Sequence, residues 1–371
     1  MSCHDPIARV DAVTVGIDLP TPLLLGSTEI GRREYAVVTV TTEDGLSGSS
    51  YSLTRALPLA AAVRTALAPL LVGADSALIA AAWDRCYRAT APGGRTGILM
   101  RGLSLVDIAL WDIKAKRAGL PLWAMLGGHR REVPVLVVGG YPRPDRSVAE
   151  TGEIAASYLR RGHPLVKLAR LPEPAETRTM LAAAAAAADG ATGRFVVDAG
   201  WFWRSAREAL AEIRMWGDVE LAWLEDPLPP EDVAACAALR ADGPFPLGIG
   251  DDLTDPHLLR RLAQDRALDV VRLDVTSIGG VTAAAKVVAW AEAAGLPVST
   301  HVYPELHVHL CAGWAGCTYL ETFDPEDNAF DPASRLFRSR VEFADGKARA
   351  PNAPGLGLEL DDEFVDAHRL D

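Results

Sequence analysis

Residues 269–302 read DVVRLDVTSIGGVTAAAKVVAWAEAAGLPVSTHV and hold the pattern from which the fold can be recognised. A short apolar run, DVVRLDV, is followed by a helical segment and then by a second apolar run, PVSTHV. Because both runs are almost continuously apolar, they are typical of parallel strands that helices cover on both faces. The second-last residue of each run is ionisable, Asp274 in the first and His301 in the second. We therefore expect a strand–helix–strand unit with polar chemistry at the ends of its strands.

The same unit recurs from Val133 onward. Eight apolar runs separated by helical segments can be counted: VPVLVVGG (133–140), PLVKLA (164–169), RFVVDAG (194–200), LAWLEDP (221–227), FPLGIGDD (245–252), DVVRLDV (269–275), PVSTHV (297–302) and TYLET (318–322). Eight repeats favour closure into an α/β barrel over an open, doubly wound parallel sheet.

The first part of the chain has a different pattern. Residues 35–42 (YAVVTVTT) are rich in β-branched side chains and end at an acidic turn with a glycine, which predicts a hairpin or meander. Apolar residues recur three and four apart over Leu103–Ala118 (LSLVDIALWDIKAKRA), which predicts a helix. Strands followed by helices are typical of an α+β unit. We expect an N-terminal α+β domain, a barrel domain and a C-terminal segment that packs back on the first domain, with the boundaries 1–127, 128–330 and 331–371.

Composition excludes several classes of protein. Of the 371 residues, 49% are apolar and 23% are charged, which suits a large core and excludes a mainly disordered chain. The 37 basic and 49 acidic residues give a net charge of −12 without a basic run, so we expect no nucleic-acid partner. The longest monotonous apolar run, residues 180–188, is too short to span a bilayer, so no membrane segment is expected.

Cysteine usage indicates the cellular compartment. The five cysteines are scattered, show no Cys-x-x-Cys spacing and follow no signal sequence, so we expect reduced thiols in the cytoplasm. They are Cys3, Cys86, Cys236, Cys311 and Cys317. A symmetric homo-oligomer is expected on general grounds.

The carboxyl ends of the apolar runs carry ionisable side chains. In chain order they are Lys167, Asp198, Glu225, Asp251, Asp274, His301 and Glu321. The last five intervals are 27, 26, 23, 27 and 20 residues, about the length of one strand–helix unit. Because the carboxyl ends of barrel strands meet at one mouth, we expect these side chains to converge there as an active site.

Three of these side chains are carboxylates on neighbouring strands. Asp198, Glu225 and Asp251 would repel one another in a mouth of low dielectric constant unless a cation or raised pKa values reduced their charge. Oxygen ligands without nearby cysteine or histidine favour a hard ion such as Mg²⁺. Taken singly, each acid has an alternative role as the N-cap of the following helix.

His301 and Asp274 form a second group. A carboxylate that accepts a hydrogen bond from one imidazole nitrogen fixes the tautomer and raises the basicity of the other nitrogen, as a general base requires. His301 alone would be an ordinary core or capping histidine, and this is what we expect for His307 and His309 in the next helical segment. The acidic partner one unit earlier favours catalysis for His301.

These motifs together resemble the mandelate racemase subgroup of the enolase superfamily. The resemblance rests on DVTSIGGVT (274–282), on His301 27 residues after Asp274, and on YLE, which ends at Glu321, 20 residues later. It also rests on SLVDIALWDIKAKRA (104–118) followed by GLPLWAMLGG, which looks like that superfamily's passage from a capping domain into a barrel. The resemblance covers nearly the whole chain.

What the resemblance implies is an α+β capping domain, completed by the C-terminal tail, over a modified (β/α)₇β barrel. It further implies abstraction of the proton α to a carboxylate, with Mg²⁺ stabilising the enediolate of a small hydroxy-acid substrate. The roles that it implies are metal ligation by Asp198, Glu225 and Asp251, a general base formed by His301 with Asp274, and a hydrogen bond from Glu321 to the substrate carboxylate.

One departure from the family pattern bears on the reaction. The family often has a Lys-x-Lys pair on the second strand, whose second lysine is the opposing base; here Lys167 has the first place and Ala169 the second. Strand alternation directs both side chains inward and turns Arg170 away. The opposing base is missing unless Lys167 moves in. Racemisation needs two bases, whereas dehydration can proceed with one, so the sequence favours elimination.

Other departures leave alternatives open. Asp251 stands where glutamate is usual, so Asp252 is a second candidate for the third ligand. Gly200 replaces an asparagine, and Ser277 stands where some relatives have a catalytic lysine. Arg272 should point inward, either to bind a substrate anion or to pair with a ligand carboxylate.

Substrate choice is expected from capping loops around Leu23–Arg33 and Gly48–Arg55. Tyr51 and Arg101 are candidates to reach the pocket, and an ordinary surface position is the alternative for each. A hydroxylated mono- or diacid would suit a mouth with inward-facing cationic side chains.

The sequence is compatible with three functions. The first is an Mg²⁺-dependent dehydratase, a lyase of acid-sugar (aldonate or aldarate) catabolism. The second is an isomerase of the same superfamily, either a racemase, an epimerase or a cycloisomerase. The third is a non-catalytic metal-binding scaffold that lost its chemistry with the second lysine.

Overall fold

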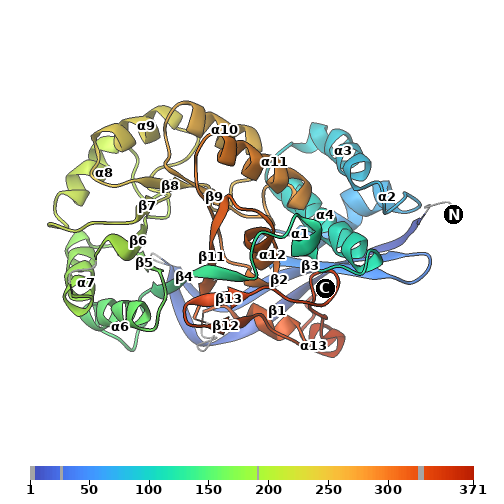
Figure 1. Ribbon diagram of the computed structural model, residues 1–371, viewed down its shortest axis with the longest axis horizontal. Coiled ribbons are helices and arrows are strands. Elements are labelled where there is room, and N and C mark those ends of the chain that lie inside the picture. Colours follow the sequence, from blue (N-terminus) through green and yellow to red (C-terminus); the bar gives the residue numbers. More distant parts are fainter. Residues whose placement is uncertain (1–4, 26–27, 190–191, 325–329) are drawn as a thin grey trace.

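The computed structural model describes residues 5–25, 28–189, 192–324 and 330–371, and it places a closed barrel beside a layer of antiparallel strands (Figure 1). Eight parallel strands are hydrogen-bonded in chain order, and the last pairs back with the first to close the ring. They are β4 (Glu132–Gly140), β5 (Leu165–Ala169), β6 (Phe195–Asp198), β7 (Trp223–Glu225), β8 (Leu247–Ile249), β9 (Val270–Leu273), β10 (Val298–Thr300) and β11 (Cys317–Phe323). Each of the eight predicted runs overlaps one of these strands, so the barrel is confirmed.

Seven helices connect the strands and cover the outside of the ring, which gives the (β/α)₇β order (Figure 1). They are α6 (Val148–Arg160), α7 (Pro174–Ala187), α8 (Ala206–Ile213), α9 (Val233–Asp242), α10 (Pro256–Gln264), α11 (Gly280–Ala293) and α12 (Pro304–Gly313). Helix α10 shows how the pattern works: Leu259 and Leu262 are buried against the barrel, while Arg260 and Arg261 are exposed. The apolar face of such a helix therefore covers the outside of the barrel.

The N-terminal part is an antiparallel sheet with helices. Its strands, in the order β1-β2-β3, are β1 (Ile7–Leu25), β2 (Thr28–Thr42) and β3 (Ser47–Leu53). Its helices are α1 (Leu59–Ala62), α2 (Ala68–Leu71), α3 (Ile79–Thr90) and α4 (Ile98–Arg117), and α5 (Leu122–Met125) leads into the barrel. A tight turn joins β2 to β3, so the predicted hairpin is confirmed.

The two segments expected as capping loops are mostly strand. β2 begins at Thr28 and β3 extends to Leu53, because both segments pair edge to edge in the sheet, with Tyr35 opposite Leu53. Residues 26–27 of the first segment lie outside the described part of the chain. The expectation of loops is therefore wrong for the described residues, although strand ends from both segments do reach the barrel mouth.

Helix α4 fastens the N-terminal part to the barrel. It begins five residues before the predicted start, at Ile98, and packs against α11. The Asp107 carboxylate accepts a hydrogen bond from the Thr282 backbone (2.9 Å), and Trp111 Nε1 donates to the Thr282 hydroxyl (2.9 Å). A Cβ on Gly280 would lie 2.4 Å from Asp107, so only glycine fits at this approach. The contact sets where the cap lies over the barrel mouth.

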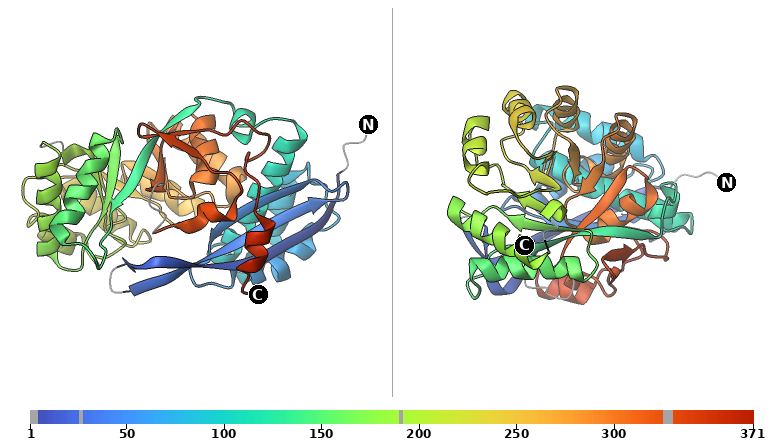
Figure 2. Two further views of the ribbon diagram at one scale, coloured as in Figure 1. Left: turned by 90° about the horizontal axis from the view of Figure 1, so that it is seen from below. Right: turned by 60° about the vertical axis from the view of Figure 1, so that its left-hand side comes forward.

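The C-terminal tail contacts both parts of the molecule (Figure 2). Strand β13 (Lys347–Arg349), which forms a hairpin with β12 (Glu342–Ala344), pairs antiparallel with the start of β4. After α13 (Asp362–Ala367), the backbone of Leu370 donates to Thr14 of β1 (2.8 Å). The tail thus reaches the first domain, as expected, and it also extends the barrel sheet, which the sequence did not indicate.

The described residues contain no helix suited to a membrane and no disulfide. No helix there combines the length and the hydropathy that crossing a bilayer requires. Cys86, Cys236, Cys311 and Cys317 are buried free thiols, and Cys3 lies outside the described residues.

Candidate active site

All seven side chains expected at the mouth lie at the carboxyl ends of barrel strands. Lys167 is in β5, Asp198 and Glu225 end β6 and β7, Asp251 follows β8, Asp274 and His301 directly follow β9 and β10, and Glu321 is in β11. One carboxylate oxygen from each of Asp198, Glu225 and Asp251 lies within 4.8 Å of the others. Spacing alone thus predicted which acids converge.

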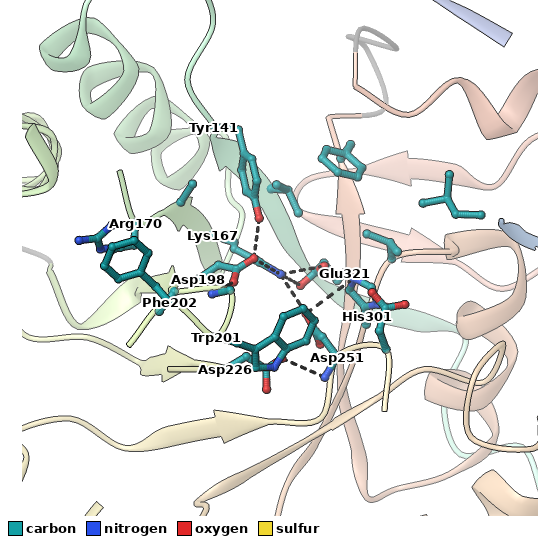
Figure 3. A pocket seen from close by; sticks show the side chains of 18 of the residues that line it. Tyr141, Lys167, Arg170, Asp198, Trp201, Phe202, Asp226, Asp251, His301 and Glu321 are labelled. Carbon is teal, nitrogen blue, oxygen red and sulfur yellow. Dashed lines mark hydrogen bonds and ion pairs between the residues drawn. The ribbon is translucent and has the colours of Figure 1, made fainter. Parts of the chain in front are cut away.

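Lys167 lies at the centre of this group, and Figure 3 shows its side chain among the acids. Its Nζ is 3.2 Å from Asp198 Oδ2, 3.2 Å from Asp251 Oδ2 and 3.4 Å from Glu321 Oε1, and it also contacts Glu225 Oε1. Burial opposes its charge, but the surrounding carboxylates outweigh burial and raise the pKa of Lys167 well above its usual value. Lys167 therefore stays an ammonium group.

Arg272 approaches the same acids from the barrel interior. Its Nε is 2.9 Å from Asp251 Oδ1 and 3.0 Å from Glu225 Oε2, and its Nη2 is 2.5 Å from Glu321 Oε2. The side chain is fully buried and does not line the cavity. Of the two roles expected for Arg272, substrate binding is therefore wrong, because the guanidinium forms ion pairs with three carboxylates and does not reach the cavity.

The acids respond differently to these two cations. Burial would raise the pKa of Asp251, but Arg272 and His301 outweigh burial and hold that pKa well below its usual value. For Glu225, burial raises the pKa well above its usual value, and Arg272 offsets this only in part. Glu225 Oε1 is buried, and its ion-pair contact with Lys167 Nζ lacks hydrogen-bond geometry. An oxygen in this position would gain most from a divalent cation, so the donor set fits a hard metal ion.

His301 lies beside the carboxylate group with an acid behind it. Its Nδ1 is 3.4 Å from Asp274 Oδ2, and its Nε2 is 3.7 Å from Asp251 Oδ2. Two hydrogen bonds from Thr276, from its backbone (2.8 Å) and its hydroxyl (2.7 Å), hold the Asp274 carboxylate in place. Burial would lower the pKa of His301, but Asp251 and Asp274 outweigh burial and raise it to about 9. His301 and Asp274 thus have the geometry of an oriented base.

The backbone after His301 has an unusual conformation. Val302 and Tyr303 have φ values of 39° and 48°, in the left-handed region that a β-branched residue such as valine strongly avoids. Tyr303 accepts a hydrogen bond at its hydroxyl from the backbone of Leu53 (3.2 Å), a residue of the capping sheet. Strain of this kind is retained where surrounding contacts impose it, and here it directly follows His301 in the chain.

Asp251 and Asp252 are adjacent but have different surroundings. Asp252 pairs with two arginines of the cap: Arg55 Nη2 is 2.7 Å from Oδ2, and Arg101 Nη2 is 2.7 Å from Oδ1. Asp251, in contrast, lies among the barrel acids, and its backbone N–H donates to Asp226 Oδ2 (3.0 Å). The geometry groups Asp251, and not Asp252, with the other two candidate ligands.

These groups border a cavity of about 480 Å³ between the barrel mouth and the cap (Figure 3). From the cap, Arg33, Leu53 and Arg55 line it. From the barrel, the lining includes Tyr141, Lys167, Ala169, Arg170, Asp198, Trp201, Phe202, Asp251, His301, Glu321 and Phe323. A cavity of this size accommodates a small polar metabolite.

Comparison with known proteins establishes the family. Residues 8–127 match the description "Mandelate racemase / muconate lactonizing enzyme, N-terminal domain", and residues 150–364 match "Enolase C-terminal domain-like". The chain belongs to the mandelate racemase/muconate lactonizing enzyme family. The resemblance noted in the sequence is thereby confirmed, and so is the fold of a capped, modified barrel.

Relatives within the mandelate racemase family include enzymes of more than one reaction type. The chain is 30% identical to a 3,6-anhydro-α-L-galactonate cycloisomerase of Streptomyces coelicolor, over 96% of this chain and 98% of that protein. It is 29% identical to an L-talarate/galactarate dehydratase of Salmonella typhimurium, over 97% and 90% respectively. Among solved structures, an L-talarate dehydratase of Polaromonas sp. JS666, complexed with Mg and L-glucarate, superposes with a TM-score of 0.86 at 29% identity, covering 99% of this chain and 98% of that one.

In this member of the mandelate racemase/muconate lactonizing enzyme family, Ala169 occupies the strand position at which relatives often have a second lysine. Lys167 and Ala169 both line the cavity, as strand alternation predicted. Arg170 was expected to turn away but also reaches the cavity wall, because it follows the last residue of β5, where the alternation of the strand no longer holds. No lysine other than Lys167 lines the cavity in the described part of the chain.

Two expected substrate contacts are wrong. Tyr51 is fully buried and donates its hydroxyl to Glu305 of α12, because β3 faces that helix and not the cavity at this residue. Arg101 pairs with Asp252, as described above, and does not line the cavity. Both side chains contact acidic residues of the barrel domain instead of the cavity.

The sequence did not single out Tyr141, Asp226 or the aromatic wall. The Tyr141 hydroxyl donates to Asp198 Oδ2 (2.5 Å), and Asp226 accepts hydrogen bonds from the backbone of Gly250 and Asp251 (3.0 Å each). Tyr141 directly follows β4, so the rule that found the acids could also have found it. Trp201 and its neighbour Phe202 are large exposed apolar residues after β6, and nothing in their spacing marked them.

Proposed function

We propose that this protein is an Mg²⁺-dependent enzyme that removes the proton α to a carboxylate, and that it dehydrates an acid sugar. The observation that carries the proposal is a single oriented base at the mouth, His301 backed by Asp274, with Ala169 where a second lysine would stand. One base suits elimination, because the same group can take the α-proton and return it to the leaving hydroxyl. The dehydratases among the relatives support this reaction class.

Asp198, Glu225 and Asp251 would hold the metal, since one carboxylate oxygen of each lies within 4.8 Å of the others. Bound there, Mg²⁺ supplies positive charge to the oxygens of the substrate carboxylate. Lys167 is already an ammonium group beside these acids, and it would donate a hydrogen bond to the same carboxylate. Glu321, the donor that the family resemblance implies, lines the same cavity and lies 3.4 Å from Lys167 Nζ.

In the proposed reaction, His301 acts in its neutral form: Nε2 accepts the α-proton, and Asp274 stabilises the resulting imidazolium at Nδ1. The electron pair of the broken C–H bond forms the double bond toward the carboxylate carbon. When the C–O bond at the β-carbon then breaks, His301 returns its proton to the departing hydroxide, and water leaves. The resulting enol becomes a 2-keto acid, so the atoms and charges balance.

A cycloisomerase is the second candidate, because the relative at 30% identity carries that name. It would use the same base, and either Lys167 or water on the other face of the substrate. A screen of aldonic and aldaric acids and their anhydro and lactone forms with Mg²⁺, scored for 2-keto acids and by mass spectrometry for the loss of one water, separates the two, since dehydration removes a water and cycloisomerisation leaves the molecular mass unchanged. Running the reactions in deuterated water adds a second readout, because a two-base racemase labels both enantiomers. Absence of both 2-keto acid and α-proton exchange with every acid would refute the proposal.

The proposal also covers the segment boundaries, the cellular compartment and the oligomeric state. We propose three segments, 1–127, 128–330 and 331–371, and the two family matches fall largely on either side of the first boundary. We further propose a cytoplasmic homo-oligomer; the buried free thiols support a reducing compartment. Light scattering on the purified protein tests the oligomer.

A further inference from the structure

Among the described residues, four arginine and lysine side chains line the cavity, and three of them already have carboxylate partners. Lys167 lies among the barrel acids, as described above. Arg170 forms a bidentate pair with Glu212, with Nε and Nη2 at 2.9 Å and 2.7 Å from the two carboxylate oxygens. Arg55 pairs with Asp252. Their charges are therefore neutralised before any substrate binds.

Arg33 is the exception. It lies near the start of β2, its side chain is 6% exposed, and its Nε donates to the backbone carbonyl of Phe330 (3.1 Å). Among the described residues, no carboxylate lies within ion-pair distance of it. A guanidinium has five donor hydrogens, and this one uses a single hydrogen for a neutral acceptor. Filling the cavity would strip the remaining water from Arg33, at a large cost unless the ligand supplied an anion.

The position of Arg33 separates it from the proton-abstraction group. Arg33 comes from the capping sheet, whereas Lys167, Asp198 and His301 come from barrel strand ends. Phe330, its hydrogen-bond partner, packs against Phe323 of the cavity wall, with ring centroids 6.0 Å apart. In the described part of the chain, the cavity thus has a metal-ligand and base end in the barrel and, on the cap side, one cation without a carboxylate partner.

We propose that Arg33 binds a second carboxylate of the substrate, distant from the carboxylate next to the reacting α-carbon, so that the enzyme acts on diacid sugars in preference to monoacids. The proposal rests on the proposed function and adds the substrate class. A planar guanidinium fork matches a carboxylate bidentately, and the cavity of about 480 Å³ suits a chain of five or six carbons. A phosphate group would satisfy the same fork, so the test includes it.

The first experiment compares substrates that differ only at the end remote from the α-carbon. Hexaric acids, the corresponding hexonic acids and their 6-phosphates are assayed with Mg²⁺. We expect kcat/KM to be about 100-fold higher for the best diacid than for its monoacid counterpart. Equal or higher kcat/KM for the monoacid or the phosphate ester would overturn the proposal while leaving the proposed dehydration intact.

The second experiment tests the residue. In Arg33→Met the ratio of diacid to monoacid kcat/KM should fall about 100-fold, and in Arg33→Lys, which keeps the charge and loses the fork, about 10-fold. Arg32→Met is the matched control: it is the neighbouring arginine, exposed and paired with Asp18 at 2.7 Å, and its ratio should equal that of the wild type. A ratio unchanged in Arg33→Met, with folding checked by circular dichroism, would contradict the assignment.

A binding measurement separates this inference from the reaction itself. Adipate and hexanoate have the same carbon chain, differ by the terminal carboxylate and lack the hydroxyl groups needed for dehydration. Calorimetry with Mg²⁺ present should show at least 10-fold tighter binding of adipate to the wild type and no preference in Arg33→Met. Equal affinities in the wild type would refute the role of Arg33 whether or not dehydration is observed.

Discussion

Buried histidines at the barrel mouth and in helix α12 have pKa values that are shifted in opposite directions. His301 at the mouth faces Asp251 and Asp274, and these carboxylates outweigh burial, so its pKa rises to about 9. His307 and His309 in α12 are equally buried, and burial lowers the pKa of each to about 4. Burial alone favours the neutral imidazole, and only uncompensated acids reverse this. A buried histidine is therefore a candidate base because of its neighbours, not because of its depth.

Hydrogen bonding shows the same difference. His307 accepts from the backbone of Val275 (2.9 Å) and contacts the carbonyl of Val302, while His309 accepts from the backbone of Trp123 (3.3 Å) and contacts the carbonyl of Leu356 (2.9 Å). Both rings are satisfied by main-chain groups, as expected for structural histidines. At the mouth, in contrast, acids compete for too few cations. That surplus of negative charge makes the mouth a site for a cation.

Among substitutions at the mouth, a change of His301 is expected to have the largest effect. His301→Asn should lower kcat about 1,000-fold, because a general base typically contributes 100- to 10,000-fold, while calorimetry should find Mg²⁺ affinity within a factor of three of the wild type. His257→Asn, on the exposed side of α10, is the control and should keep full activity. Retained turnover in His301→Asn would remove His301 from the mechanism.

Arg272→Met tests how much the positive charge of Arg272 stabilises the acids at the mouth. It leaves Asp251, Glu225 and Glu321 with less positive charge, so the metal-free protein should lose about 3 kcal/mol of unfolding free energy. Thermal denaturation with and without Mg²⁺ measures this, and the metal should raise Tm more in the variant than in the wild type. An equal increase in both proteins would show that Arg272 does not share its acids with the metal. Arg272→Lys should recover part of the loss.

The adjacent acids test which one serves the metal. Asp251→Asn should weaken Mg²⁺ binding at least 10-fold, because it removes one oxygen of the converging set. Asp252→Asn should leave Mg²⁺ affinity within a factor of three, because Asp252 is held by Arg55 and Arg101. Calorimetric titration of both variants decides, and the reverse result would make Asp252 the ligand.

The helix α12 histidines predict an acid-side loss of stability. Their pKa of about 4 lies below the ordinary value of 6.5, so between pH 6.5 and 4 the unfolded chain binds more protons. The contribution of each ring is present above pH 6.5 and is lost as the pH falls toward 4. His309→Gln should therefore reduce the slope of unfolding free energy against pH by up to about 1.4 kcal/mol per pH unit. Urea denaturation at pH 7, 6 and 5 measures it; an unchanged slope would mean that the pKa of His309 is the same in the folded and the unfolded chain.

Much of this architecture is readable from local patterns. The apolar runs identified all eight barrel strands, and the regular spacing from Asp198 to Glu321 identified the side chains at the mouth. Both succeed because strand periodicity and unit length depend on short stretches of chain. Even the inward direction of Lys167 and Ala169 follows from alternation within one strand.

The misplaced residues depend on contacts across long separations in the chain. Tyr51 meets Glu305, 254 residues away, and Arg101 meets Asp252, 151 residues away. Neither partner could be chosen without knowing how the cap docks over the barrel. For Arg272, alternation predicted an inward direction, but two destinations lay inward, and only the packed arrangement of Asp251, Glu225 and Glu321 selects between them.

Local sequence thus dictated the succession of strands and helices and the ionisable residue that ends each strand, because these follow from periodicities a few residues long. Tertiary packing decided which charges are neutralised and which are left over. Arg33 and Arg55 leave the same sheet toward the same cavity, yet Arg55 meets Asp252 and Arg33 meets no described carboxylate. Charge pairing is a property of distances in space, and those distances exist only once the cap and barrel are in contact.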